Sequence, residues 1–243
     1  MSESPSIPAA DPRRVAELAA NLAAVRARLA AAESQAGRDP GAVTLIAVSK
    51  FFPASDVDAL AALGVSDFGE NKHQEAVVKV GQVQASGLVW HFIGQLQTNK
   101  AAAVAGYADQ VDSVDRRSLV TALDKGARAA GRKVDVLIQV SLDDVPTAGR
   151  GGADPAAVAE LAEAIEAAEQ LRLRGVMGVA PKGEDPAVAF ARLVQSSREL
   201  RRVYPKAQQV SAGMSGDIEA AVAAGATHVR VGTALLGARP ALR

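Results

Sequence analysis

The sequence contains no cysteine, and only 3% of its residues are aromatic. The absence of cysteine excludes disulfide bonds, thiolate nucleophiles and zinc sites built from cysteine. So few aromatic rings argue against a surface that stacks the bases of single-stranded nucleic acid. Lysine plus arginine and aspartate plus glutamate each number 27, so the formal net charge is zero. No global positive field is therefore expected to attract a nucleic acid.

Long hydrophobic runs are also missing, since no stretch approaches the ~18 apolar residues that a membrane span needs. Residues 1–10 are polar and contain proline, without the apolar segment of a secretion signal. We therefore expect a disordered tail over these residues and a cytoplasmic protein without a membrane partner. His73, His91 and His228 lack the spacing of metal ligands, and we expect no metal site.

Hydrophobic residues make up 49% of the chain, which is enough for one large core. From Val43 onward, short apolar runs alternate with amphipathic segments, a pattern typical of a parallel sheet. The predicted strands lie near residues 43–48, 66–68, 88–93, 110–113, 134–140, 173–179, 208–211 and 227–231. The predicted helices between them lie near residues 54–63, 71–80, 97–105, 116–130, 154–170, 186–203 and 216–224.

Eight strands that alternate with seven helices in 243 residues favour an α/β protein with a single (β/α)8 TIM-type barrel. The alternative is an open doubly wound sheet. Residues 11–243 would form this one domain, with an extra N-terminal helix from Asp11-Pro12 to Gln35. The segment Asp143–Gly152 is long and contains several glycines, so it is a candidate lid over the strand ends.

The segment Val43–Lys50, with the sequence VTLIAVSK, places a lysine at the end of the first predicted strand. In α/β folds, ligands bind at the carboxyl ends of the strands. A lysine on an apolar rim loses hydration, which favours the neutral amine that attacks a carbonyl group. The alternative is a lysine that merely reaches solvent at a strand end.

A second signal lies in the loops after the seventh and eighth strands, where barrels frequently bind phosphate. Small residues there let backbone N–H groups approach an anion. The candidate residues are Ser211, Gly213, Ser215, Gly232 and Thr233. The alternative is that glycine and serine only cap a helix. Together with Lys50, such a site suits a phosphorylated aldehyde held as a Schiff base, either pyridoxal phosphate (PLP) or a sugar phosphate.

Three further residues are candidates for contacts with a ligand. Asn71 follows the second strand and could contact a ring substituent, although Gly-Glu-Asn is also an ordinary helix start. His91 either meets a ligand inside the barrel or is a hydrogen-bonded core histidine. Arg230 alternates with valines, so it either faces the interior and needs a partner, such as a cofactor nitrogen or a phosphate, or pairs outward on the helix layer.

Several short motifs occur in a fixed order along the chain: Ala47-Val48-Ser49-Lys50, Phe68-Gly69-Glu70-Asn71, His91-Phe92-Ile93-Gly94, Leu96-Gln97-Thr98-Asn99-Lys100, Ser113-Val114-Asp115, Gly213-Met214-Ser215 and Arg230-Val231-Gly232-Thr233. Together they resemble the pyridoxal phosphate homeostasis proteins, also called the YggS family or the proline synthase co-transcribed homologue family. The resemblance runs from about Val43 to Arg239. It implies a barrel like the N-terminal domain of alanine racemase, the PLP fold type III.

The resemblance also implies PLP bound as an internal aldimine on Lys50. Arg230 would then approach the pyridine nitrogen, and Asn71 would lie near the ring. The residues implied around the phosphate are Ser211, Gly213, Met214, Ser215, Gly232 and Thr233. The family resemblance further implies a monomeric PLP carrier that buffers the cofactor and delivers it to apo-enzymes, without established catalysis.

Two features of the sequence fit a carrier better than an enzyme. An arginine at the pyridine nitrogen disfavours its protonation and weakens the cofactor as an electron sink. The related racemases also take a tyrosine base from a second domain, whereas this sequence ends at Arg243 and its tyrosines, Tyr107 and Tyr204, fall at helix ends or in loops. The alternatives are a PLP-dependent amino acid racemase or decarboxylase, a Schiff-base aldolase without cofactor, and a barrel whose Lys50 is incidental.

Overall fold

The structure is a computed structural model that describes residues 11–143 and 150–238. The predicted tail over residues 1–10 lies outside these ranges, as do residues 144–149 of the predicted lid segment. Within the described ranges, none of the helices combines the length and the apolar character that crossing a bilayer requires.

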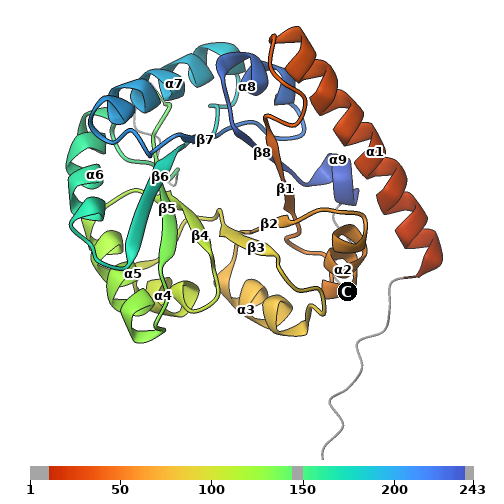
Figure 1. Cartoon of the computed structure of the whole chain (residues 1–243), viewed down its shortest axis with the longest axis horizontal. Helices are drawn as coiled ribbons and strands as arrows, with labels where there is room; N and C mark the ends of the chain where they lie inside the picture. Colours follow the sequence, from red (N-terminus) through yellow and green to blue (C-terminus); the bar gives the residue numbers. More distant parts are fainter. Residues whose placement is uncertain (1–10, 144–149, 239–243) are drawn as a thin grey trace, which may run out of the picture.

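Eight parallel strands form a closed barrel in sequence order, and β1 pairs with both β2 and β8 (Figure 1). The strands are β1 (Thr44–Val48), β2 (Asp67–Glu70), β3 (Val89–Phe92), β4 (Gln110–Val114), β5 (Val134–Gln139), β6 (Leu171–Met177), β7 (Gln209–Ser211) and β8 (His228–Val231). The predicted (β/α)8 barrel is confirmed, and the open sheet is excluded by the β1–β8 pairing. Each predicted strand is present, although β6 begins at Leu171 rather than at residue 173.

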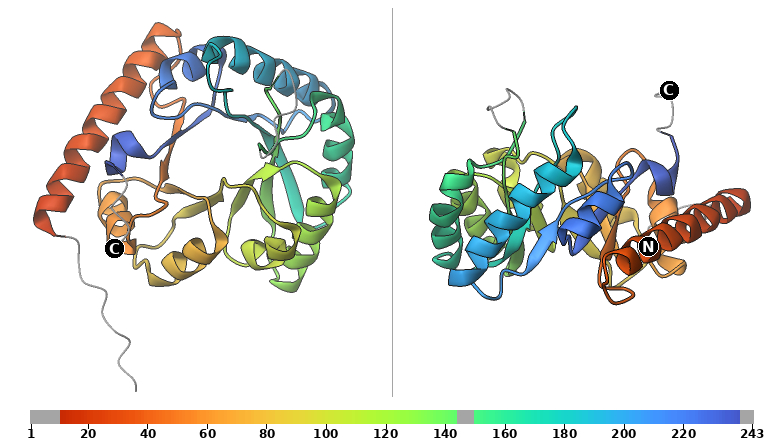
Figure 2. Two further views of the ribbon diagram at one scale, coloured as in Figure 1. Left: turned by 180° about the vertical axis from the view of Figure 1, so that it is seen from behind. Right: turned by 90° about the horizontal axis from the view of Figure 1, so that it is seen from above.

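Helices surround the barrel, as both views in Figure 2 show. They are α1 (Pro12–Gln35), α2 (Ala54–Ala62), α3 (His73–Gln82), α4 (Thr98–Ala105), α5 (Arg117–Ala129), α6 (Val158–Glu166), α7 (Pro186–Val203), α8 (Ile218–Ala224) and α9 (Thr233–Leu236), with a short 3-10 helix η1 (Pro155–Ala157) before α6. The structure adds α9 to the predicted helices. At only four residues, α9 is too short to cover the outer face of β8 and β1.

The N-terminal helix α1 takes the place that a full eighth barrel helix would occupy. It contacts α2, α8 and α9 and lies along the outside of the ring in Figure 1. Its apolar face is buried in one cluster with Ala47 of β1 and Val231 of β8. The side chains of this face are Leu18, Leu22, Val25 and Leu29. The helix thus closes the side of the barrel where β1 meets β8, the strands that carry Lys50 and Arg230.

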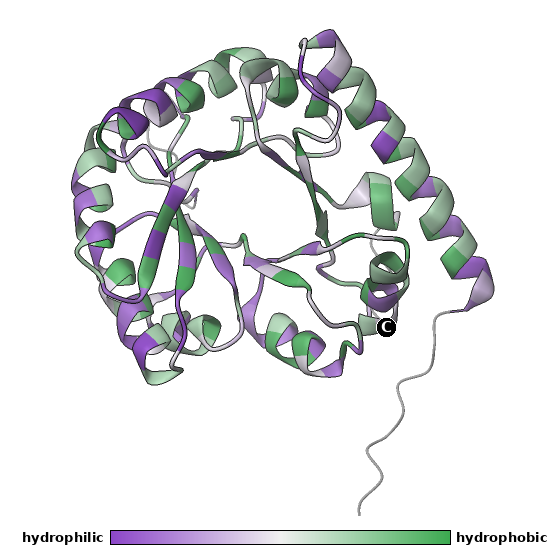
Figure 3. Cartoon of the chain, in the orientation of Figure 1, coloured by the Kyte–Doolittle hydropathy of each residue, from purple (hydrophilic) through white to green (hydrophobic). Residues whose placement is uncertain are grey.

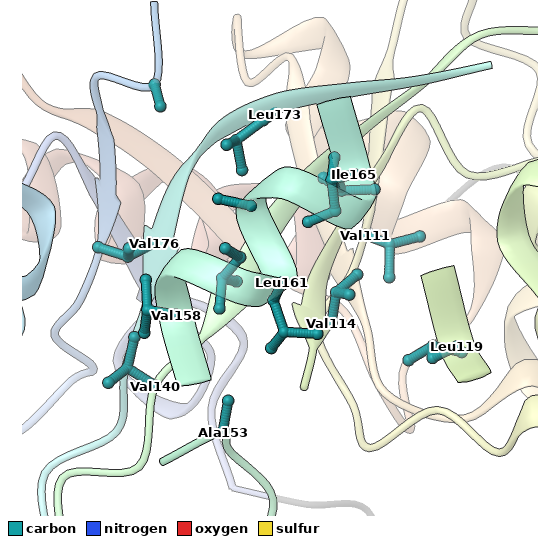
Figure 4. Close-up of a cluster of buried hydrophobic side chains, with 14 of the residues drawn as sticks. Val111, Val114, Leu119, Val140, Ala153, Val158, Leu161, Ile165, Leu173 and Val176 are labelled. Atoms are coloured by element: carbon teal, nitrogen blue, oxygen red, sulfur yellow. The ribbon is translucent and has the colours of Figure 1, made fainter. Parts of the chain in front are cut away.

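The hydrophobic core lies mainly between the strands and the helix layer. Figure 4 shows part of it, where Leu161 and Ile165 of α6 pack among the valines of β4 and β6. Each such side chain contributes about 1.5–3 kcal/mol when it is fully buried. The outer helices carry both hydrophilic and hydrophobic residues, as Figure 3 shows. Because this layer supplies most of the apolar burial, the barrel interior can hold polar groups.

Candidate functional site

The predicted site residues gather at the carboxyl end of the barrel and in its interior. Lys50 follows β1, Asn71 follows β2, and His91 lies within β3. Ser211 is the last residue of β7 and begins the loop with Gly213, Met214 and Ser215. Arg230 lies in β8, followed by Gly232 and Thr233. The closed barrel therefore brings together residues that are up to 183 positions apart, from 50 to 233.

Lys50 is half-buried and lies next to the barrel interior. Ala47 packs toward the helices, so the alternation of side chains directs Ile46 and Val48 inward and makes Lys50 the next residue on that side. Its Nζ atom lies 5.9 Å from the centroid of the Phe51 ring. Of the described residues, none provides the Lys50 amine with a hydrogen-bond acceptor or a carboxylate partner. The amine is therefore available for a ligand.

A chain of polar groups crosses the barrel interior from β8 to β2. The Arg230 Nη1 atom donates to Ser211 Oγ at 2.7 Å, and Ser211 Oγ donates to Asp112 Oδ2 at 3.1 Å. Asp112 Oδ1 lies 3.3 Å from His91 Nδ1, and His91 Nε2 lies 3.1 Å from Asp67 Oδ1. With His91 protonated, this polar chain contains two cations and two anions and is neutral.

His91 lies between two carboxylates and is only 2% exposed. Burial lowers its pKa, but the hydrogen bonds with Asp112 and Asp67 outweigh burial and raise the pKa to about 9. Burial raises the pKa of Asp112, whereas its bond with His91 more than compensates, so the net pKa is lowered. Both ring nitrogens face carboxylates. Of the two alternatives, a ligand contact or a hydrogen-bonded core histidine, the structure therefore fits the second.

Arg230 faces the barrel interior and is 4% exposed, which decides between the two orientations that the sequence left open. Its Nη2 atom donates to the carbonyl oxygen of Gly178 at 2.8 Å. Burial lowers the pKa of Arg230, and the nearby Asp112 carboxylate opposes this effect. The guanidinium is held beneath the strand ends by fixed partners on β7 and the loop after β6.

The loop after β7 depends on Gly213, which has a φ of +89°. A Cβ atom added to Gly213 would lie 2.5 Å from the Ala221 Cβ of α8, so a larger residue would push the loop off this helix. Ser215 Oγ accepts from the Ala234 amide at 3.3 Å, which ties this loop to the loop after β8. The Ser215 carbonyl accepts from Arg28 of α1 at 2.8 Å. Met214 is 42% exposed at the tip.

The loop after β8 runs beside the end of β1. A Cβ atom placed on Gly232 would lie 3.5 Å from both the Cβ and the carbonyl oxygen of Val48, two residues before Lys50. Thr233 begins α9 directly after this glycine. The candidate phosphate residues and the candidate amine therefore share one edge of the barrel, as the sequence predicted from the adjacency of the first and eighth strands.

Asn71 packs closely against the loop after β3. A Cβ atom added to Gly94 would lie 2.0 Å from the Asn71 carbonyl oxygen and 2.8 Å from its Oδ1 atom. The close approach of Asn71 therefore explains why glycine is required at position 94, which the motif alone did not reveal. The absence of a side chain there fixes the position of Asn71 at the mouth of the barrel.

Sequence reasoning missed the carboxylates and the lysine that support the site. Asp67 and Asp112 hold His91. Glu70 and Lys79 form a buried ion pair with Nζ and Oε1 2.5 Å apart. Asp112 had a detectable signal, because it stands in an otherwise buried strand, where an acidic side chain requires a partner. Lys79 had none, because on a helix it looks like a solvent-exposed residue.

A separate groove of about 890 Å³ lies at the other end of the barrel. Its lining includes Ala62, Leu63, Val65 and Leu88, which precede β2 and β3 and so stand at the amino ends of the strands. None of the predicted site residues lines this groove. The chemistry of the chain is therefore concentrated at the opposite, carboxyl end.

The barrel and its site can be compared with known proteins. The family described as "Alanine racemase, N-terminal domain" matches residues 20–240. Solved alanine racemases share the fold at low sequence identity. The enzyme from Corynebacterium glutamicum has a TM-score of 0.67 and 16% identity, and the match covers 94% of this chain and 63% of that one. The fold and this match define the class of the protein, a barrel of the alanine racemase N-terminal type.

Within that class, the chain belongs to the family of pyridoxal phosphate homeostasis proteins. The protein of that name from Mycobacterium tuberculosis H37Rv is 43% identical over 247 residues, covering 94% of this chain and 95% of its own. The Escherichia coli K12 protein is 41% identical over 236 residues, covering 92% and 97%. The structure of PipY from Synechococcus elongatus with PLP bound has a TM-score of 0.77 and 36% identity, covering 90% of this chain and all of that one.

Proposed function

We propose that this protein binds PLP through a Schiff base on Lys50 and acts in PLP homeostasis, as a carrier that buffers the cofactor and delivers it to apo-enzymes. The observation that carries the proposal is the position of the Lys50 amine at the carboxyl end of β1, beside the loop that contains Gly232 and without a polar partner among the described residues. The name of the relatives and the PLP complex of PipY support the same ligand.

The donor set of the site fits this cofactor. PLP supplies a reactive aldehyde, which condenses with a deprotonated lysine amine and releases water. Lys50 is the half-buried amine suited to that bond. Arg230 offers a fixed cation beneath the mouth for the pyridine nitrogen, and Asn71 lies at the edge of the barrel for a ring substituent. The loops after β7 and β8 offer hydroxyls and small residues to a phosphate: Ser211, Gly213, Met214, Ser215, Gly232 and Thr233.

His91 is assigned an indirect role. Both of its ring nitrogens face carboxylates, so it acts on the ligand through Asp112, Ser211 and Arg230 rather than by contact. A protonated His91 neutralises Asp112 and fixes the side of that carboxylate that meets Ser211. The contacts from His91 through Asp112 and Ser211 thereby set the orientation of the Arg230 side chain in the barrel interior.

The position of the tyrosines supports a carrier over a racemase or a decarboxylase. Tyr107 and Tyr204 both pack against the hydrophobic cluster between the strands and the helices, outside the barrel interior. Burial raises the pKa of Tyr107 far above its usual range, with a smaller contribution from the Glu70 charge. Both phenols therefore belong to side chains that pack outside the barrel interior, away from a ligand on Lys50.

The proposal is tested by loading the purified protein with PLP, removing free cofactor by gel filtration and recording the absorption spectrum. Wild type is expected to retain an imine absorption band, which Lys50→Ala lacks. The loaded protein is then mixed with a PLP-dependent apo-enzyme, whose activity is expected to recover. Retention of the imine band by Lys50→Ala would overturn the assignment of Lys50 as the residue that forms the Schiff base, and rapid exchange of an amino acid Cα proton with deuterated solvent would favour an enzyme.

A further inference from the structure

The backbone that carries Lys50 forms a strained turn. The Phe52 amide donates to the Ser49 carbonyl oxygen at 3.1 Å, which closes the turn around Lys50 and Phe51. Phe51 has a φ of +72°, the only positive φ at a non-glycine position among the described residues. A bulky residue in the left-handed region is unfavourable and persists only where its surroundings enforce it.

One side of this turn is held by a buried lysine from α3. Lys79 is 4% exposed, and its Nζ atom donates to the Ser49 carbonyl oxygen at 2.6 Å. The same amine donates to Glu70 Oε1 at 2.5 Å and to Glu75 Oε1 at 3.2 Å. An ammonium group has three donors, and here each has an acceptor. Lys79 is therefore committed to its protein partners, in contrast to Lys50, whose amine has no polar partner in the part of the chain that the structure describes.

The other side of the turn is held by Glu75, one helical turn before Lys79. Its Oε1 atom accepts a hydrogen bond from the Phe51 backbone amide. Ser49 is fixed a second time, because its hydroxyl donates to Glu70 Oε1 at 2.7 Å. The residues immediately before and after Lys50 are thus both held by charged side chains, while Lys50 has no such contact within residues 11–143 and 150–238.

We propose that Glu75 and Lys79 are positioning residues that clamp the backbone on both sides of Lys50 and direct its amine toward the loops after β7 and β8. This inference rests on the proposed function, because it concerns the geometry of the bond to PLP. The two parts of the site lie on separate strands, so a ligand that joins them requires a fixed distance between them. A displacement of about 1 Å between two reacting groups can lower the rate of their reaction about 100-fold.

Glu75 offers the sharper test, since leucine removes the acceptor for the Phe51 amide and glutamine retains it. Gln74→Leu introduces the same side chain at the exposed neighbouring position and is the matched control. Two ligands are titrated into each protein: PLP, and pyridoxine 5′-phosphate, which lacks the aldehyde. We expect Glu75→Leu to weaken PLP binding about 10-fold, as for loss of a charge-assisted hydrogen bond, and to leave pyridoxine 5′-phosphate binding unchanged.

Glu75→Gln is expected to restore most of the PLP affinity, and Gln74→Leu to match wild type. The Lys79 side is tested with the double variant Glu70→Gln/Lys79→Met, because Lys79→Met alone would leave a buried carboxylate without its cation. This double variant is expected to show the same selective loss of PLP affinity. Thermal unfolding of each variant establishes that it is folded before the titrations are compared.

The possible failures are distinguishable. A wild-type protein that binds no PLP at Lys50 would overturn the proposed function and the clamp together. Wild-type binding with an unchanged PLP affinity in Glu75→Leu and in the double variant would overturn the clamp alone. An equal loss of both ligands in these variants would also overturn it, because that pattern indicates a general structural role rather than positioning of the Lys50 amine.

Discussion

The buried His91 predicts a specific dependence of stability on pH. The pKa of His91 is raised from an ordinary value of 6.5 to about 9 in the folded protein, because Asp112 and Asp67 outweigh the effect of burial. The folded protein therefore holds this proton more tightly than the unfolded chain does. The resulting stabilisation is fully present below pH 6.5 and is lost as the pH rises through about 9.

The size of the effect follows from the two pKa values. Their difference, at about 1.4 kcal/mol per pH unit, corresponds to about 3 kcal/mol. Between pH 6.5 and 9 the wild-type protein is expected to lose about 2–3 kcal/mol of unfolding free energy relative to a His91→Gln variant. Burial lowers the pKa values of His73 and His228, so their contributions change below this window.

Urea unfolding of wild type and His91→Gln across this pH range measures the difference directly. His73→Gln is the matched control, since His73 is half-buried and has no carboxylate partner among the described residues. Its curve is expected to run parallel to that of wild type. A His91→Gln curve that also runs parallel to wild type would contradict the raised pKa of His91. The same holds if nuclear magnetic resonance shows the folded His91 imidazole titrating near its ordinary pKa.

Three substitutions test the other supports of the site. Ser211→Ala removes the hydroxyl that links Arg230 to Asp112, and the loss of unfolding free energy, measured in urea, is expected to be about 1–3 kcal/mol. Gly213→Ala places a methyl group 2.5 Å from Ala221 Cβ at a positive φ, so thermal unfolding should show a loss of about 1–3 kcal/mol together with weaker PLP binding; unchanged values would argue against a tightly packed loop. Leu22→Ala opens a cavity under α1 and is expected to cost about 2–5 kcal/mol, whereas a loss below 1 kcal/mol would mean that α1 contributes little to closing the barrel.

The sequence was sufficient to predict the barrel, because short strand segments alternate regularly with amphipathic helical segments along the chain. It also indicated that Lys50 and the loops after β7 and β8 share one edge of the barrel, since the carboxyl ends of parallel strands meet there. The gap in the helix layer that α1 fills, between α2 and α8, could not be predicted in the same way. That gap exists because α9 has only four residues. The sequence pattern near the C-terminus did not predict α9.

The polar chain in the barrel interior was beyond the reach of the sequence for a geometric reason. Asp67, His91, Asp112 and Ser211 come from four different strands, and their contacts depend on the relative register of those strands. A single strand reveals only which residues share a face. The same limit applies to two partners of Lys79, the Ser49 carbonyl and the Glu70 carboxylate, which lie on other segments, whereas Glu75 lies on the same helix.

The most direct test of the account is chemical identification of the cofactor anchor. The PLP-loaded protein is reduced with borohydride, digested, and analysed by peptide mass mapping. We expect a pyridoxyl adduct on the peptide that contains Lys50, with Lys79 unmodified and no such adduct in Lys50→Ala. An absence of any adduct, or adducts on exposed lysines with Lys50 unmodified, would contradict the assignment of Lys50 as the residue that binds PLP.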